Sequence, residues 1–171
     1  MRARELDARG EIVAAAAAYE AALAEGVDEL PVYLDLAILY WLATDFGHAA
    51  AHQLDDAFVE RAGRRFGELL DLAAERFDDD GEIEFWRYYV AFVSYGEPPD
   101  PELCRRILEM GTTSTPAFHL ASLATTPELE SSLAVLDRWA ADGATERKRF
   151  VRSALQGLRA SRRPRARSPD R

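Results

Sequence analysis

Two histidines and two acids in the first third of the chain have the spacing of a metal site. His48 and His52 are four residues apart, and Asp55 and Asp56 follow three and four residues after His52. On a helix these intervals place side chains on one face, where imidazole and carboxylate groups could share a zinc-like ion. There is no Glu-x-x-His motif, and the remaining histidine, His119, is far along the chain. We therefore expect a polar helix start that faces water and no metal, and we name His48, His52 and Asp56 as the candidate ligands.

Two other stretches contain residues that could do chemistry. The acids of "FDDDGEIE" precede a glycine, as in a calcium loop, but Arg76 and Arg87 stand at the first and the closing ligand positions. Acids that cap the following helix explain this stretch better. Cys104 lies beside Arg105 and Arg106, which could lower its pKa, but no base can be assigned to it. Since no glycine-rich phosphate loop or nucleophile elbow occurs either, we expect no catalysis and no cofactor.

The composition is typical of one folded domain. The chain has 171 residues, of which 48% are hydrophobic, and this is enough to bury a core. The lone cysteine excludes an intramolecular disulfide and fits a reducing compartment. We see neither a signal peptide nor an apolar stretch long enough to cross a bilayer. We therefore expect a cytoplasmic protein that does not bind membranes.

The net charge of −9 hides a strong asymmetry. From residue 147 onward there are ten basic residues and a single acid, Asp170, which leaves 11 of the 21 basic and 29 of the 30 acidic residues before that point. The chain is thus an acidic body followed by a basic arm, and the arm is a candidate contact for anionic partners. An equally acceptable interpretation is that the arm improves solubility or folds onto the acidic body.

Helical spacing runs through almost the whole sequence, and no alternating β-branched run predicts a strand. Gly, Pro and Asp separate the apolar stretches. We predict an all-α domain of six to eight helices over residues 1–158, with one long helix across much of residues 48–77. Residues 159–171 contain no large apolar side chain and are expected to form a disordered tail.

The stretch "GEIVAAAAAYEAALAEG" is an alanine-rich helix with small residues where a neighbouring backbone must come close. Ala15, Ala18 and Ala22 are the small positions, and Tyr19 and Leu23 supply bulk one turn apart. An alanine face lets two helices approach toward the lower end of the usual ~8–10 Å separation. The helix is therefore expected to pack closely against a neighbour.

This helix and the next resemble the second helix of one tetratricopeptide repeat and the first helix of the following repeat. The resemblance rests on small and aromatic residues around the turn "GVDELP", namely Gly10, Ala15, Tyr19, Ala22, Tyr33, Leu36, Ala37 and Tyr40. It covers residues 1–45. The turn glycines Gly10, Gly47 and Gly96 are 37 and 49 residues apart, whereas the family repeats every ~34 residues. The resemblance implies a degenerate stack of antiparallel helix hairpins, an α-solenoid; a closed, irregular helical bundle is the alternative.

In tetratricopeptide proteins the first helices of successive repeats line a concave face that holds a partner's peptide or helix. Carried over to this chain, the resemblance implies a groove lined by Leu34, Ile38, Trp41, Trp86 and Tyr89. Exposed aromatics anchor partners well because they bury much area with few rotatable bonds. The default interpretation of "FWRYYVAF" is nevertheless core, since a helix that is apolar on two sides is usually sandwiched between neighbours, and the groove is its functional alternative.

We therefore expect a non-catalytic protein–protein interaction module, a small adaptor or chaperone-like protein. Two alternatives remain open. An immunity-type protein would use its acidic body to neutralise a basic toxin or nuclease by surface complementarity. A nucleic-acid accessory protein would contact phosphates, without sequence specificity, through the arginines of the tail: Arg159, Arg162, Arg163, Arg165 and Arg167.

Overall fold

The computed structural model describes residues 2–78, 80–98, 100–111, 113–123 and 126–162. These residues form helices and turns without a strand, which confirms the all-α prediction. Within these ranges the helices number ten rather than six to eight: α1 (Arg2–Ala8), α2 (Ile12–Ala24), α3 (Leu30–Ala43), α4 (Phe46–Ala51), α5 (Asp56–Arg76), α6 (Gly81–Tyr95), α7 (Pro101–Glu109), α8 (Pro116–Leu123), α9 (Pro127–Ala140) and α10 (Glu146–Arg162).

The long helix expected across residues 48–77 is two helices, α4 and α5. His52 caps the end of α4, and Gln53 has φ 52°, a left-handed conformation that stops a helix. The side chain of Asp55 then accepts a hydrogen bond of 2.7 Å from the backbone N–H of Phe58 and starts α5. This break turns α4 away from α5 and gives its histidines a different neighbourhood from that of Asp56.

Acidic residues begin several of the helices. Asp80 caps α6 by accepting a 2.8 Å hydrogen bond from the N–H of Glu82, as expected for the acids of "FDDDGEIE". Asp45 and Asp100 do the same for α4 and α7. At the other end of α6, Gly96 ends the helix in the left-handed conformation with φ 68°.

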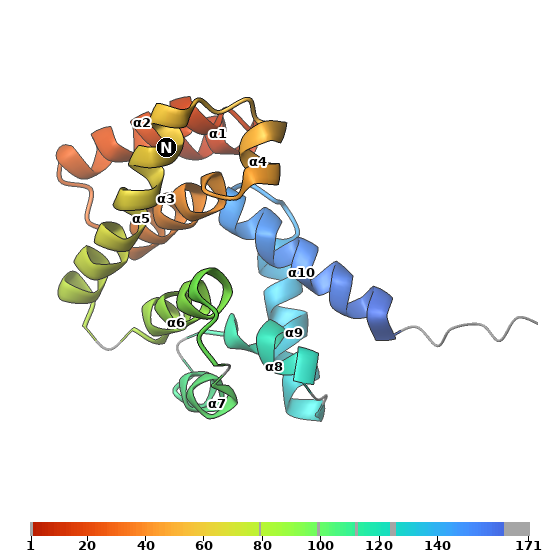
Figure 1. Ribbon diagram of the computed structural model, residues 1–171. Helices are drawn as coiled ribbons and strands as arrows, with labels where there is room; N and C mark the ends of the chain where they lie inside the picture. Colours follow the sequence, from red (N-terminus) through yellow and green to blue (C-terminus); the bar gives the residue numbers. More distant parts are fainter. Residues whose placement is uncertain (1, 79, 99, 112, 124–125, 163–171) are drawn as a thin grey trace, which may run out of the picture.

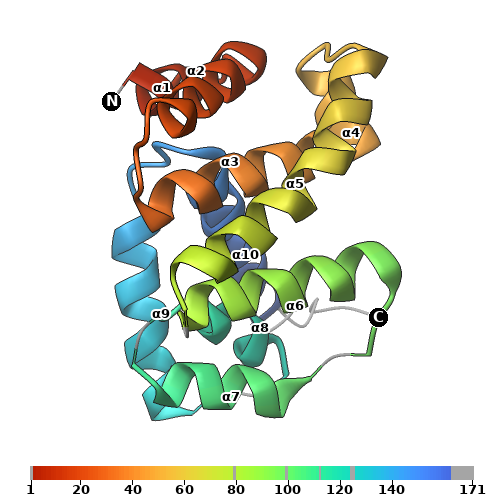
Figure 2. The same ribbon diagram turned by 90° about the vertical axis from the view of Figure 1, so that its left-hand side faces the viewer.

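The helices pack in chain order until the last one returns to the beginning. The helix pair α1–α2 lies beside α3, which packs along α5, and α6 to α9 follow below them (Figure 1). Helix α10, in blue, runs past α9 and α8 and also packs against α3. Figure 2 shows α10 behind α3, with α9 on one side and α4 and α5 on the other. The return contact between α10 and α3 closes the stack, whereas repeats of an open solenoid contact only their neighbours.

Helix α3 is the centre of the molecule. Every residue from Val32 to Trp41 is buried, because α2, α5 and α10 cover the helix on different sides. A helix that is apolar all round is stable only in such a setting. One residue of this run, Asp35, is charged, so its carboxylate must find partners inside the protein.

Helix α10 also corrects the expected start of the tail. It continues through Arg162, so residues 159–162 are helical rather than part of a disordered segment. Residues 163–171 lie outside the described part of the chain. Within the described part, no helix has both the length and the apolarity that crossing a membrane requires.

Candidate functional site

The aromatic residues expected to line a partner groove surround a side chain of the protein's own last helix. The ring of Phe150, on α10, lies 5.4 Å from that of Trp41, 5.9 Å from that of Tyr89 and 6.1 Å from that of Trp86, measured between centroids. Trp86 is completely buried, Trp41 is buried and Tyr89 is partly buried. These three residues lie together around Phe150, so α10 covers the surface on which a groove was expected.

The two aliphatic groove candidates are core residues as well. Leu34 and Ile38 lie on α3 and are buried. Leu34, Ile38 and Trp86 are therefore too buried to line a groove, and the core interpretation holds for Trp86. The physical reason is that the apolar side of α10, which includes the buried residues Val151 and Leu155, packs against α3. The local sequence pattern does not reveal that these two helices are neighbours.

The tail candidates divide between helix and undescribed chain. Arg159 lies on α10, and its guanidinium makes an ion pair of 3.1 Å with Asp137 of α9. Arg162 is the last residue of α10. Arg163, Arg165 and Arg167 lie outside the described residues. The structure thus assigns Arg159 a contact within the protein.

A buried arginine joins α10 to two other helices. Arg147 donates from Nε to Asp35 Oδ1 at 2.8 Å and from Nη1 to Glu82 Oε1 at 3.1 Å. Glu82 also accepts from Trp86 Nε1 at 2.9 Å and from the hydroxyl of Thr115 at 2.7 Å. Burial opposes the charge of Arg147, but the two carboxylates outweigh it and raise its pKa. This network is structural, because its charges meet partners on other helices.

A second buried carboxylate holds the start of α10 against α1 and α2. Asp7 accepts from Arg149 Nη2 at 2.7 Å, from the backbone N–H of Glu146 at 2.9 Å and from the hydroxyl of Tyr19 at 3.2 Å. Burial raises the pKa of Asp7 to about 6, and the charge of Arg149 opposes that rise. Residues 145–149, with the sequence "TERKR", are therefore the point at which α10 is joined to the first three helices.

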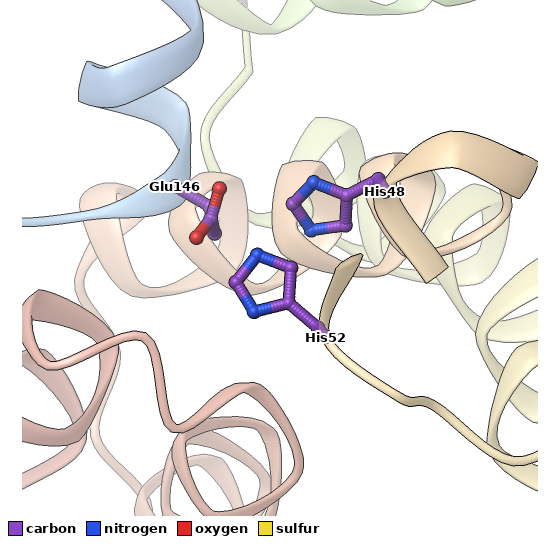
Figure 3. A group of neighbouring side chains, drawn as sticks. All are labelled: His48, His52 and Glu146. Carbon is purple, nitrogen blue, oxygen red and sulfur yellow. The ribbon is translucent and has the colours of Figure 1, made fainter. Parts of the chain in front are cut away.

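The histidines of α4 lie beside this joint. Figure 3 shows His48, on α4, and His52, at its end, beside Glu146, which lies at the start of α10. One potential ligand atom of each residue lies within 4.8 Å of those of the other two. His48 is half-buried, His52 is exposed and Glu146 is buried. The spacing of the two histidines is visible in the sequence, but the approach of Glu146 is not, because the two stretches are far apart in the chain.

The third candidate ligand, Asp56, is not part of this group. Asp56 is exposed in the first turn of α5, and the group of potential ligand atoms does not include it. The expectation depended on one continuous helix, and the break around Gln53 removes the common face.

His48 has an unsatisfied buried atom. Its Nε2 is shielded from solvent and has no hydrogen-bond partner among the residues that the structure describes. Leaving such an atom unpaired costs about 1–3 kcal/mol, so an unpaired nitrogen at this place needs an explanation. Burial lowers the pKa of His48, while the nearby carboxylate of Glu146 acts in the opposite direction.

Cys104 and His119, the other side chains that could do chemistry, lie in environments that do not activate them. Cys104 is buried on α7, and burial raises the pKa of its thiol to about 12; the neighbouring Arg105 opposes this effect but does not overcome it. His119 is buried on α8, lies 3.0 Å from the hydroxyl of Tyr88, and has a pKa lowered by burial. Neither side chain is therefore an activated nucleophile or base.

A surface hollow of about 570 Å³ opens where the ends of α3 and α6 meet α4 and α10. Trp41, Val93 and Phe150 form its apolar wall, and Asp45 and His48 lie at the side formed by α4. The indole Nε1 of Trp41 donates to Ser94 at 2.8 Å, which fixes the ring in the wall.

Two large aromatic side chains that are open to solvent directly follow, in the sequence, residues that line this hollow. Phe46 follows the lining residue Asp45 and is 89% exposed; Tyr95 follows the lining residue Ser94 and is 70% exposed. Val93, in the wall itself, is half exposed. We call Trp41 and Phe150, which line the hollow, and Phe46 and Tyr95, which follow lining residues, the aromatic rim. Exposed apolar side chains are typical of interaction surfaces where they form a patch.

Comparison of the chain with protein-family models, with curated proteins and with solved structures finds no match. What the protein does must therefore be argued from its own geometry.

Proposed function

We propose that this protein is a non-catalytic protein–protein interaction module that binds a peptide or helix of another protein at the aromatic rim. The observation that carries the proposal is the exposure of Phe46 and Tyr95, which directly follow residues that line a hollow whose wall contains Trp41 and Phe150. Aromatic side chains with neighbouring apolar pockets are the commonest anchors of protein interfaces.

This is the type of function expected from the tetratricopeptide resemblance, but the proposed binding surface is the aromatic rim and not the groove expected from the sequence. We propose that α1 to α5 form a degenerate helix-hairpin stack of that type, whose inner face is filled by α10. Trp41 belongs both to the filled inner face and to the hollow, because it contacts Phe150 of α10 and also lines the hollow. A partner would then bind at the hollow and not along the inner face of the helix stack.

Charge favours a basic partner. The residues before position 147 hold 29 acids and 11 basic residues, and Asp45 lies in the wall of the hollow. A peptide with an apolar anchor between lysines or arginines would match both features, and its association would weaken with salt. An immunity-type protein that neutralises a basic toxin is a second form of the same proposal, because the same complementarity would serve it.

The test compares binding by matched surface variants. The full chain is immobilised, proteins captured from a native lysate are identified, and the affinity of each captured protein is then measured after its purification. We expect the double variant Phe46→Ser/Tyr95→Ser to weaken binding at least about 30-fold, which is the loss typical of interface anchors. Val13→Ser, which removes a half-exposed apolar side chain from α2, serves as the control and should bind as the wild type does.

Two outcomes would count against the aromatic rim. Equal affinity of the double variant and the control would place the interface elsewhere. Binding that survives the double variant but disappears when residues 163–171 are removed would assign the partner to the basic tail, and release of nucleic acid by salt would identify that partner as nucleic acid.

A further inference from the structure

We propose that His48, His52 and Glu146 form a binding site for one divalent transition-metal ion, of which zinc is the best fit, between α4 and the start of α10. Two imidazoles and one carboxylate are a ligand set that zinc commonly uses. Their potential ligand atoms already lie within 4.8 Å of one another, although Glu146 comes from a distant part of the chain (Figure 3). The site does not depend on the proposed interaction function.

The backbone of α4 presents the two histidines together. His48 and His52 are separated by one turn, and the backbone N–H of His52 donates to the carbonyl of His48 at 3.1 Å. Their rings lie 4.5 Å apart between centroids, tilted by 38°. The capping hydrogen bond of 2.8 Å from the His48 N–H to Asp45 Oδ1 holds the beginning of this short helix. The spacing of four residues is the one that lets two histidines of a helix share an ion.

The buried nitrogen of His48 is the independent observation that points to a ligand. Nε2 of this ring is closed to solvent and has no hydrogen-bond partner in the described part of the chain. Neighbouring His52 and Glu146 have potential ligand atoms close by. A metal ion bound between the three residues would give the buried nitrogen the partner that it lacks.

The third ligand is already oriented. Arg149 donates to Glu146 Oε1 from Nη2 at 2.5 Å and from Nε at 3.1 Å. The backbone N–H of Glu146 is held by Asp7 at 2.9 Å. Hydrogen bonds of this kind fix the direction of a ligating carboxylate, so Asp7 and Arg149 would be positioning residues of the site. The positive charge of Arg149 also limits the affinity that the site can reach.

For zinc to bind, the three ligand atoms must move closer together. Zinc–nitrogen bonds of about 2.0–2.1 Å in tetrahedral geometry place ligand atoms about 3.3 Å apart, so ligand atoms that lie up to 4.8 Å apart must approach. The exposed ring of His52 has the freedom to move inward. Three protein ligands leave the fourth position of a tetrahedral ion for water or for a group from a partner. A bound ion would also tie α4 to α10, and would stabilise the fold by an amount that rises with the logarithm of its concentration.

The experiment uses the full chain without an affinity tag, freed of metal by dialysis against a chelator. Zinc is titrated by calorimetry, and thermal unfolding is followed with and without zinc. We expect one ion per chain, a higher Tm with zinc, and visible absorption typical of a tetrahedral site when cobalt replaces zinc. His52→Gln, which changes an exposed side chain, should weaken zinc binding more than about 100-fold, since even changes around metal ligands cost 10–100-fold. His48→Gln should have the same effect.

Asp56→Asn is the matched control, because Asp56 is exposed and lies outside the group of potential ligands. Its zinc affinity and cobalt spectrum should equal those of the wild type. Absence of saturable zinc binding would overturn the proposal. So would zinc binding that persists unchanged in His52→Gln, since the ion would then be held by other residues. A loss of binding in Asp56→Asn equal to that in His52→Gln would also overturn it.

Discussion

Arg147 carries a charge that the surrounding helices bury almost completely. The residue is 5% exposed, and its guanidinium meets Asp35 of α3 and Glu82 of α6. A buried ion pair contributes little net stability compared with apolar residues of the same volume, but removing one partner leaves the other charge buried and uncompensated. The ion pairs as a whole therefore add little net stability, whereas the loss of Arg147 alone would be costly, and the pairs hold three helices in one arrangement.

Arg147→Ala is expected to lower the free energy of unfolding by about 3–5 kcal/mol, because Asp35 would remain buried without its closest cation. Urea denaturation followed by circular dichroism measures this change. The control is Arg64→Ala, which removes an exposed ion pair of 2.5 Å with Glu60 and should change the free energy of unfolding by less than about 1 kcal/mol. Similar losses in the two variants would show that the Arg147 network does not hold the fold.

Helix α2 shows how a sequence pattern translates into packing. Ala15 and Ala16 are buried together with Tyr19, whereas Ala18 and Ala22 are only partly buried. The alanine-rich face thus packs closely, and Ala15 lies in it as expected. The face is centred differently from the Ala15, Ala18 and Ala22 stripe, since α2 is covered by both α1 and α3.

Ala15→Leu is expected to destabilise the protein by about 1–3 kcal/mol, because the added atoms have no space in a close helix crossing. Differential scanning calorimetry measures the change in Tm. Ala17→Leu introduces the same side chain at an exposed position of the same helix and is the matched control. An Ala15→Leu protein as stable as Ala17→Leu would mean that α2 does not pack closely at this position.

At the scale of the whole molecule, α10 decides the architecture. It packs on α3, α8 and α9, and its first turn carries the residues that pair with the buried carboxylates Asp7 and Asp35. Phe150 then fills the space between Trp41 and Trp86. The first and second halves of the chain are therefore joined through their last helix as well as through the contact of α5 with α6.

A chain that ends at Asp142 is expected to lose cooperative thermal unfolding. The buried carboxylates Asp7 and Asp35 would lack their arginines, and the aromatic rings that pack on Phe150 would be exposed to water. Near-ultraviolet circular dichroism of the tryptophans follows this transition. A chain that ends at Arg162 keeps all of α10 and should have the Tm of the full chain. A sharp transition at the same Tm in both truncated chains would show that α10 is not required for the fold.

The sequence by itself determined the local structure. Apolar residues at helical spacing predicted the all-α class, and Asp80 and Gly96 marked the two ends of α6 as capping residues do. Asp55 caps α5, but Leu54 and Phe58 on either side of it keep helical spacing, so the sequence pattern predicts one longer helix across this position. These features depend on residues a few positions apart, and such interactions are visible in the order of the amino acids.

Only the tertiary structure decided which surfaces meet. Helical periodicity shows that Trp86 and Phe150 each lie on an apolar face, but not that the two faces cover each other. In the same way, the spacing of His48 and His52 indicated a possible metal site, while Glu146 joins them only because α10 returns to α3 and α4. Contacts between distant parts of a chain depend on the packing of every helix between them, so no local pattern contains them.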